Sequence, residues 1–230
     1  MTELVSVVIL AHGHAALLPA AIDSVLGQGD PAVELLVVEH EPSEAVAEVV
    51  ERHSDEAVRR LSSGGKTPGA ARNAGASAAS GSLLAFLDGD DLWPPGRLGA
   101  ARAALEEDAG LDAVFGRVRA FEDRGPTPIA DPAEAARIAG APESGRMITA
   151  SVLRRPGFER VGRFEQETVL GSEIDWIARA EDARLGFGWL DDVVLLRRSH
   201  AENTTRIKRD DYGEYTRVLK RVIDRRRDGP

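Results

Sequence analysis

Cysteine is absent from all 230 residues of this chain. The absence excludes disulfides, cysteine nucleophiles and zinc sites that use thiolates. Long apolar runs are missing too, since no stretch approaches the roughly 20 residues of a membrane span. The segment from Met1 to Leu4 leads into an apolar run without the basic region and cleavage site of a signal peptide. We therefore expect a cytoplasmic protein without a transmembrane segment.

Basic charge is also scarce. The chain has 29 basic and 38 acidic side chains, a formal net charge of −9, which argues against the basic surface that non-specific nucleic-acid binding requires. With 43% hydrophobic and 29% charged residues, its length suits one large or two small globular domains. The charge is divided unevenly: residues 206–230 hold nine basic and five acidic side chains, or +4, which leaves −13 on residues 1–205.

Short apolar, β-branched runs alternate with segments of helical periodicity in the first 116 residues. Near-continuous apolar strands that alternate with helices are typical of a parallel sheet covered on both faces. We therefore predict an α/β fold. The strands are predicted at 5–10, 33–38, 58–61 and 82–87, and the helices at 17–26, 45–50 and 69–79 and after Pro94-Pro95.

The rhythm changes after residue 116. Residues 122–145 are rich in proline and glycine, which predicts a long loop with one short helix inside it. A helix is predicted at 171–185 and a late strand at 193–196. We place one domain over residues 1–205 and a helical tail over residues 206–230.

Polar side chains follow the predicted strands, where ligands of open parallel α/β sheets bind. Three carboxylates within four residues repel one another, which favours a compensating hard cation such as Mg²⁺ or Mn²⁺, shared with substrate phosphates. The alternative is that an aspartate caps the helix that follows. These residues are His12 and His14 after the first strand, Glu39, His40 and Glu41 after the second, and Asp88, Asp90 and Asp91 after the fourth.

Six segments together resemble family 2 glycosyltransferases of the GT-A fold, over most of residues 4–205. Their order matches that of the family, which makes a chance match improbable. The most specific is 69–98, with an Ala-Arg-Asn helix and a Leu-Asp-x-Asp-Asp turn. The others are 5–28, 33–43 (VELLVVEHEPS), 158–165 (FERVGRFE), 171–176 (GSEIDW) and 197–203 (RRSHAEN).

The resemblance implies a Rossmann-like, mostly parallel sheet with helices on both faces. Residues 1–116 would bind a nucleotide-sugar, with a UDP-sugar favoured, and residues 117–205 would form the acceptor and catalytic part. Catalysis would use Mn²⁺ or Mg²⁺ and invert the sugar. The implied metal ligands are Asp88, Asp90, Asp91 and His200, with Asp90 as the first choice, and the implied nucleotide contacts are His12, Glu39, Arg72, Asp88, Arg197 and Arg198.

The same resemblance implies a base that deprotonates the acceptor, and two acids are candidates. Ser172 replaces the first acid of the family's pair, so Glu173 takes the base position, while Asp175 lies two residues further along the helix. The alternative for Glu173 is a favourable interaction with the helix macrodipole. A nucleotidyltransferase and a non-catalytic nucleotide-binding member of the family are the competing functions.

Two regions depart from the family or lie outside it. The second-strand turn is Glu39-His40-Glu41-Pro42 in place of Asp-Asp-Gly-Ser, which predicts a reshaped nucleobase pocket. The acceptor region has no recognisable pattern, so a saccharide, a natural product and a peptide all stay open as acceptors. The tail contains an apolar helical stripe. It either packs on the domain or on a second subunit of a homodimer, or it binds an anionic membrane or an acidic acceptor. The stripe comprises Tyr212, Tyr215, Val218, Leu219, Val222 and Ile223.

Overall fold

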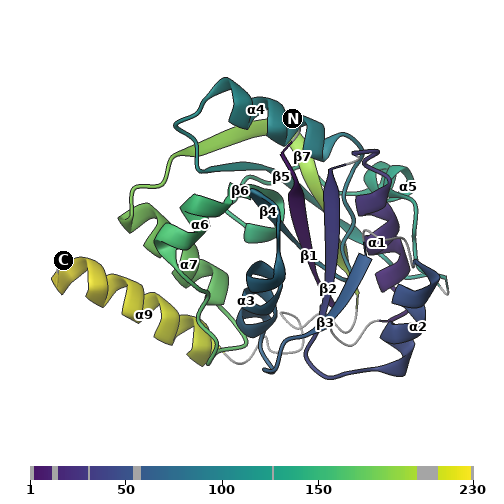
Figure 1. Ribbon diagram of the computed structural model, residues 1–230, viewed down its shortest axis with the longest axis horizontal. Helices are drawn as coiled ribbons and strands as arrows, with labels where there is room; N and C mark the ends of the chain where they lie inside the picture. The colour runs from purple at the N-terminus through teal and green to yellow at the C-terminus, as the bar shows by residue number, and fades with distance from the viewer. Residues whose placement is uncertain are drawn as a thin grey trace.

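A computed structural model of the chain describes residues 3–11, 15–30, 32–53, 58–125, 127–200 and 212–228. Its centre is a seven-stranded sheet in the order β3-β2-β1-β4-β6-β5-β7 (Figure 1). The first four strands are parallel, β6 is antiparallel to both of its neighbours, and β5 and β7 are parallel. The strands are β1 (Val5–Ala11), β2 (Val33–Glu39), β3 (Val58–Ser62), β4 (Leu83–Asp88), β5 (Ala113–Glu122), β6 (Ser151–Arg154) and β7 (Phe187–Ser199).

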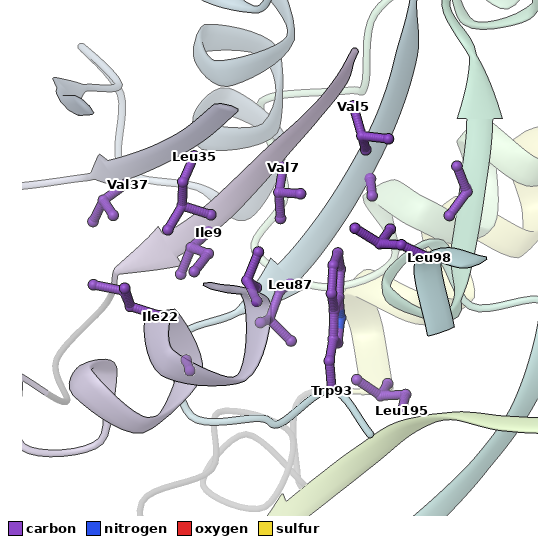
Figure 2. Packing of buried hydrophobic residues seen from close by; sticks show 14 of the residues in the cluster. Val5, Val7, Ile9, Ile22, Leu35, Val37, Leu87, Trp93, Leu98 and Leu195 are labelled. Carbon is purple, nitrogen blue, oxygen red and sulfur yellow. The ribbon is translucent and has the colours of Figure 1, made fainter. Parts of the chain in front are cut away.

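Helices cover both faces of this sheet. One core contains the odd-numbered side chains of β1 and packs against α1 (Leu18–Leu26), α2 (Glu44–Arg52) and α4 (Arg97–Glu107), and Figure 2 shows Val7 and Ile9 within it. The even-numbered side chains face α3 (Pro68–Ala78), α6 (Arg155–Val161) and α7 (Ser172–Asp182). Coverage on both faces explains why β1 is apolar at nearly every position. The other helices are α5 (Pro132–Ile138), a 3₁₀ turn (Ile148–Ala150) and α9 (Tyr212–Asp228).

A glycine allows α3 to approach the sheet closely. A Cβ atom at Gly75 would lie 2.3 Å from Cγ1 of Val8 on β1, so no larger residue fits without displacing the helix. This contact keeps α3 close to β1, and the first half of the helix contributes Pro68 and Arg72 to the same pocket as Leu10 of β1.

The predicted elements of the first 116 residues are confirmed, and so is the short helix within 122–145, which is α5. The helix after Pro94 begins later than predicted, at Arg97, behind Gly96 with a φ of +83°. Sequence analysis missed β5, β6 and α6 altogether. β5 alternates buried and partly exposed residues in its second half, so it lacks the continuous apolar pattern of β1. The predicted helix at 171–185 is confirmed as α7, and the predicted strand at 193–196 is part of β7, a longer edge strand with two exposed aspartates.

The tail packs on its own domain. α9 lies along α7, as Figure 1 shows, with Val218 and Val222 buried. Arg225 pairs with Asp175 and Asp182, and Arg226 pairs with Asp182 and Glu181. Part of the tail's positive charge therefore neutralises α7. None of the helices in the described ranges combines the length and apolar character that crossing a bilayer requires.

Candidate active site

A pocket of about 190 Å³ lies at the carboxyl ends of β1 and β4. Segments far apart in the sequence contribute to it: the turn after β4, the first turns of α3 and α7, the end of β7 and the start of α9. This is the position that the parallel sheet predicts for a ligand.

The aspartate turn, residues 88–91, forms one side of the pocket. Asp88, Asp90 and Asp91 all line it, and a Cβ atom at Gly89 would lie 2.8 Å from the carbonyl oxygen of Leu10, so the turn sits close over β1. The helix-cap alternative for these aspartates is wrong, because the residue that caps α4 is Gly96.

The turn concentrates negative charge in a partly buried place. Burial raises the pKa of Asp88 to about 6; Asp90 and Glu173 add to the rise, while Arg72 and Arg197 oppose it. Burial and the two neighbouring aspartates raise the pKa of Asp91 well above its usual value, although the carboxylate accepts a hydrogen bond from the backbone nitrogen of Arg198 at 2.8 Å. The protein's own cations therefore do not compensate the turn fully.

The donor set of the turn fits a hard divalent cation. Asp88 and Asp90 supply carboxylate oxygens, and Nε2 of His200 lies 2.9 Å from Oδ2 of Asp90. Within the described residues, no group of three acidic or histidine side chains forms a metal site by itself. Mg²⁺ commonly binds through one or two carboxylates and completes its shell with waters and substrate phosphates. The residues present therefore fit a metal that binds together with a phosphate ligand.

Arg72 supplies positive charge next to the turn. It lies on α3, is 5% exposed, and places Nη2 3.4 Å from Oδ1 of Asp88. Its Nε is buried and has no hydrogen-bond partner among the described residues, which marks a polar atom that a ligand could satisfy. The predicted proximity of Arg72 to a nucleotide is thus compatible with its place in the pocket.

The two arginines of β7 face opposite directions. Arg197 is exposed and lines the pocket, whereas Arg198 is 1% exposed and pairs with the buried Asp123. The Arg198 guanidinium also donates to the carbonyl oxygens of Asp90 at 2.6 Å and Ile129 at 2.8 Å. Arg198 thus braces the aspartate turn from behind, so the diphosphate contact predicted for it does not fit the structure.

The second-strand turn also differs from expectation. Glu39 is 2% exposed and lies outside the pocket lining, because its carboxylate accepts hydrogen bonds from the backbone nitrogen of Ser43 and from Arg60. His40 lines the pocket in its place. The nucleobase contact predicted for Glu39 therefore does not fit, and His12 lies outside the described residues.

The two candidate bases lie on one helix but face different surroundings. Glu173 lines the pocket in the first turn of α7. Asp175 points away, with one oxygen 2.8 Å from Nε of Arg179 and the other 3.1 Å from Nη1 of Arg225. Of these two acids, Glu173 is the one placed to accept a proton from a ligand, although its position in the first turn also suits the macrodipole.

Sequence reasoning missed several pocket residues. Met147 and Lys66 come from loops that carry no motif, and Tyr215 comes from α9, beyond the segments that resemble the family. The only signal for Tyr215 is its membership in the apolar stripe of the tail, which indicates burial but not where.

Comparisons with known proteins agree with this geometry. The family model described as glycosyl transferase family 2 matches residues 6–166. An uncharacterized glycosyltransferase of Nostoc sp. (strain PCC 7120) is 33% identical over 97 residues, which cover 41% of this chain and only 30% of that protein.

Two solved structures share the fold at low sequence identity. S. aureus TarS 1-349 in complex with UDP superposes with a TM-score of 0.70 and 18% identity, over 96% of this chain and 65% of that chain. The mannosyltransferase PcManGT from Pyrobaculum calidifontis, in complex with GDP-Man and Mn²⁺, superposes with a TM-score of 0.72 and 18% identity, over 100% of this chain and 66% of that chain. The fold is that of the GT-A glycosyltransferases, and the chain belongs to glycosyl transferase family 2.

Proposed function

We propose that this protein transfers a sugar from a nucleoside-diphosphate sugar to an acceptor hydroxyl, with inversion and with Mn²⁺ or Mg²⁺. The observation that carries the proposal is the pocket that joins three undercompensated aspartates, of which Asp91 is buried, to Arg72 and Glu173. The complexes of the structural neighbours with UDP, and with GDP-Man and Mn²⁺, support a nucleotide-sugar with a metal.

In this proposal the aspartate turn binds the metal and the donor's diphosphate. Asp90 is the first ligand, with Asp88 and His200 beside it, and Asp91 with Arg198 keeps the turn in place. A metal held there would neutralise the charge that develops on the leaving nucleoside diphosphate. Arg72 and Arg197 add donors for phosphate oxygens from the other sides of the pocket.

Glu173 is the base. Its carboxylate takes the proton of the acceptor hydroxyl while the acceptor oxygen bonds to the anomeric carbon and the bond to the diphosphate breaks. Attack on the face opposite the leaving group inverts the configuration. Asp175 is excluded from this role by its contacts with Arg179 and Arg225.

UDP is the proposed nucleotide, on the strength of the family resemblance and the UDP complex of TarS. Because the Glu39 carboxylate already accepts hydrogen bonds from Arg60 and Ser43, the uracil base of UDP must be recognised by other groups. His40 and Lys66 line the pocket near the second-strand turn, and we propose them for this contact.

The test combines binding with product release. A thermal-shift panel of nucleoside diphosphates with and without Mn²⁺ should show metal-dependent stabilisation by UDP, since a ligand that binds only the folded state raises stability. Asp90→Ala should remove this stabilisation and turnover, whereas Glu173→Ala should retain the stabilisation.

The competing functions give different products. If no sugar donor releases a nucleoside diphosphate in a metal-dependent manner, the chain is a binding module. Release of pyrophosphate from a nucleoside triphosphate would indicate a nucleotidyltransferase, a function that the lack of Lys or Arg in residues 11–14 disfavours.

The exposed side of α9 supports a second proposal, peripheral contact with an anionic membrane. Leu219 and Ile223 are 48% and 63% exposed, and Lys220 lies next to them on the exposed surface. Apolar residues flanked by basic ones suit an interfacial helix. Co-sedimentation with phosphatidylserine vesicles should fall for Leu219→Asp combined with Ile223→Asp; equal sedimentation of both proteins would reject the contact.

A further inference from the structure

The tail helix is fastened to the loop that precedes α7. The Glu214 carboxylate accepts hydrogen bonds from the backbone nitrogens of Val169 at 3.1 Å and Leu170 at 2.8 Å. Both residues line the pocket, so α9 fixes part of the pocket's surface.

A second contact lies at the start of α7. Gly171, with a φ of +89°, precedes α7, and a Cβ atom there would lie 3.1 Å from Cγ2 of the fully buried Val218. This packing, together with the pair between Arg225 and Asp175, holds α9 against the turn that carries Glu173. The position of α9 is therefore tied to the position of the proposed base.

Tyr215 projects from this fastened segment into the pocket. It lines the pocket with Glu173 and Arg197, and both charges act on its phenol: burial raises the pKa of Tyr215, Glu173 raises it further and Arg197 lowers it. Met147 and Leu170 add apolar surface to the same pocket. The part of the pocket lining that α9 contributes is thus an aromatic ring close enough to a carboxylate and a guanidinium to feel both charges.

We propose that Tyr215 binds the acceptor and that the acceptor is a saccharide, an inference that rests on the proposed transfer reaction. A sugar ring presents an apolar C–H face, which suits a flat aromatic ring, and hydroxyl edges, which suit Glu173 and Arg197. A peptide acceptor would have no comparable need for a flat ring next to the base.

The experiment measures acceptor binding directly, with a panel of small probes. Saturation-transfer difference NMR is recorded with UDP and Mn²⁺ present, for a series of methyl glycosides and for a serine-containing peptide. The variants are Tyr215→Phe, which keeps the ring, and Tyr215→Leu, which keeps apolar volume without the flat ring. Arg217→Ala, on the exposed side of the same helix, is the matched control.

We expect at least one glycoside to bind the wild type, Tyr215→Phe to keep that affinity within about twofold, and Tyr215→Leu to lose about tenfold. Thermal stabilisation by UDP and Mn²⁺ should be equal in all variants, which shows that the donor site is intact. The inference is overturned if Tyr215→Leu and the wild type bind the glycoside with equal affinity. It is also overturned if the wild type binds the peptide but no glycoside, or binds none of the probes.

Failure of the inference can be separated from failure of the proposed function. If the wild type releases a nucleoside diphosphate from a sugar donor and glycoside binding does not depend on Tyr215, only the acceptor assignment is wrong. If no donor yields a nucleoside diphosphate, the transfer reaction itself is wrong.

Discussion

Two acidic clusters in this protein receive opposite treatment. On α7, Asp175, Glu181 and Asp182 each pair with an arginine of α9. Burial alone would raise the pKa of Asp182, but hydrogen bonds from Arg225 and Arg226 outweigh it, and the pKa is lowered. In the aspartate turn, burial and mutual repulsion prevail instead, and the pKa values of Asp88 and Asp91 are raised.

The difference separates a structural cluster from a candidate binding cluster. Acidic side chains with a structural role are neutralised by arginines of the protein, whereas acidic side chains of a cation-binding site keep an excess of negative charge until the cation binds. This excess negative charge lowers the stability of the ligand-free protein. Six substitutions in four experiments test the comparison, from the largest expected effect to the smallest.

Glu173 and Asp175 compare the two environments on one helix. Glu173→Gln should lower kcat by about 10²–10⁴-fold, because the amide that replaces the carboxylate cannot take the acceptor proton. The affinity of this variant for UDP in the presence of Mn²⁺, measured by calorimetry, should equal that of the wild type. Asp175→Asn should keep most of its activity, and a loss as large as that of Glu173→Gln would place the base at Asp175.

Arg198 tests whether the brace behind the aspartate turn is structural. Arg198→Met leaves Asp123 buried without its partner and should lower the free energy of unfolding by about 3–5 kcal/mol, measured by urea denaturation. Arg197→Met, on the exposed side of the same strand, should weaken UDP binding with little loss of stability. The reverse pattern would assign the diphosphate contact to Arg198.

Asp90→Asn tests the surplus charge of the turn. Without metal, this variant should be slightly more stable near neutral pH, with a Tm above that of the wild type, because the charge of Asp90 raises the pKa of both neighbours.

The pH dependence gives the sign of this effect. Since the folded-state pKa of Asp88, about 6, exceeds the unfolded value, the wild type should lose stability as pH rises from about 4 to about 6. The loss should be smaller in Asp90→Asn. A lower Tm for the variant in EDTA would contradict the proposed surplus.

Asp182→Asn gives the smallest expected change, and in the opposite direction. Removing an acid that Arg225 and Arg226 already neutralise should lower Tm slightly, because partly exposed ion pairs contribute little. Activity should remain. A gain in Tm like that expected for Asp90→Asn would show that the two clusters do not differ.

Local pattern predicted much of this protein. The central strands β1, β2 and β4 and the helices between them follow from periodicity, because buried parallel strands are apolar at nearly every position and their helices carry one apolar face. The aspartate turn is a site candidate on local sequence, whereas Arg72 and Glu173 are candidates only through the family resemblance, and the structure brings all of them into one pocket.

Tertiary structure decided what local pattern could not. β5 and β6 depend on pairing with each other and with distant β4 and β7, so their own residues carry only a weak strand signal. Successive side chains of β7 point to opposite faces, and the pairing of Arg198 with Asp123 leaves Arg197 to face the pocket. Glu39 does not line the pocket because Arg60 on the neighbouring strand binds its carboxylate.

Tyr215 is the clearest case. Its sequence context indicates only an amphipathic helix, and its place beside Glu173 results from the docking of α9 on α7. The amino-acid sequence by itself thus determined the α/β order and the acidic turn, because these depend on neighbours in the chain. The tertiary structure decided which charges are neutralised and which face the pocket, because electrostatic partners are set by proximity in space.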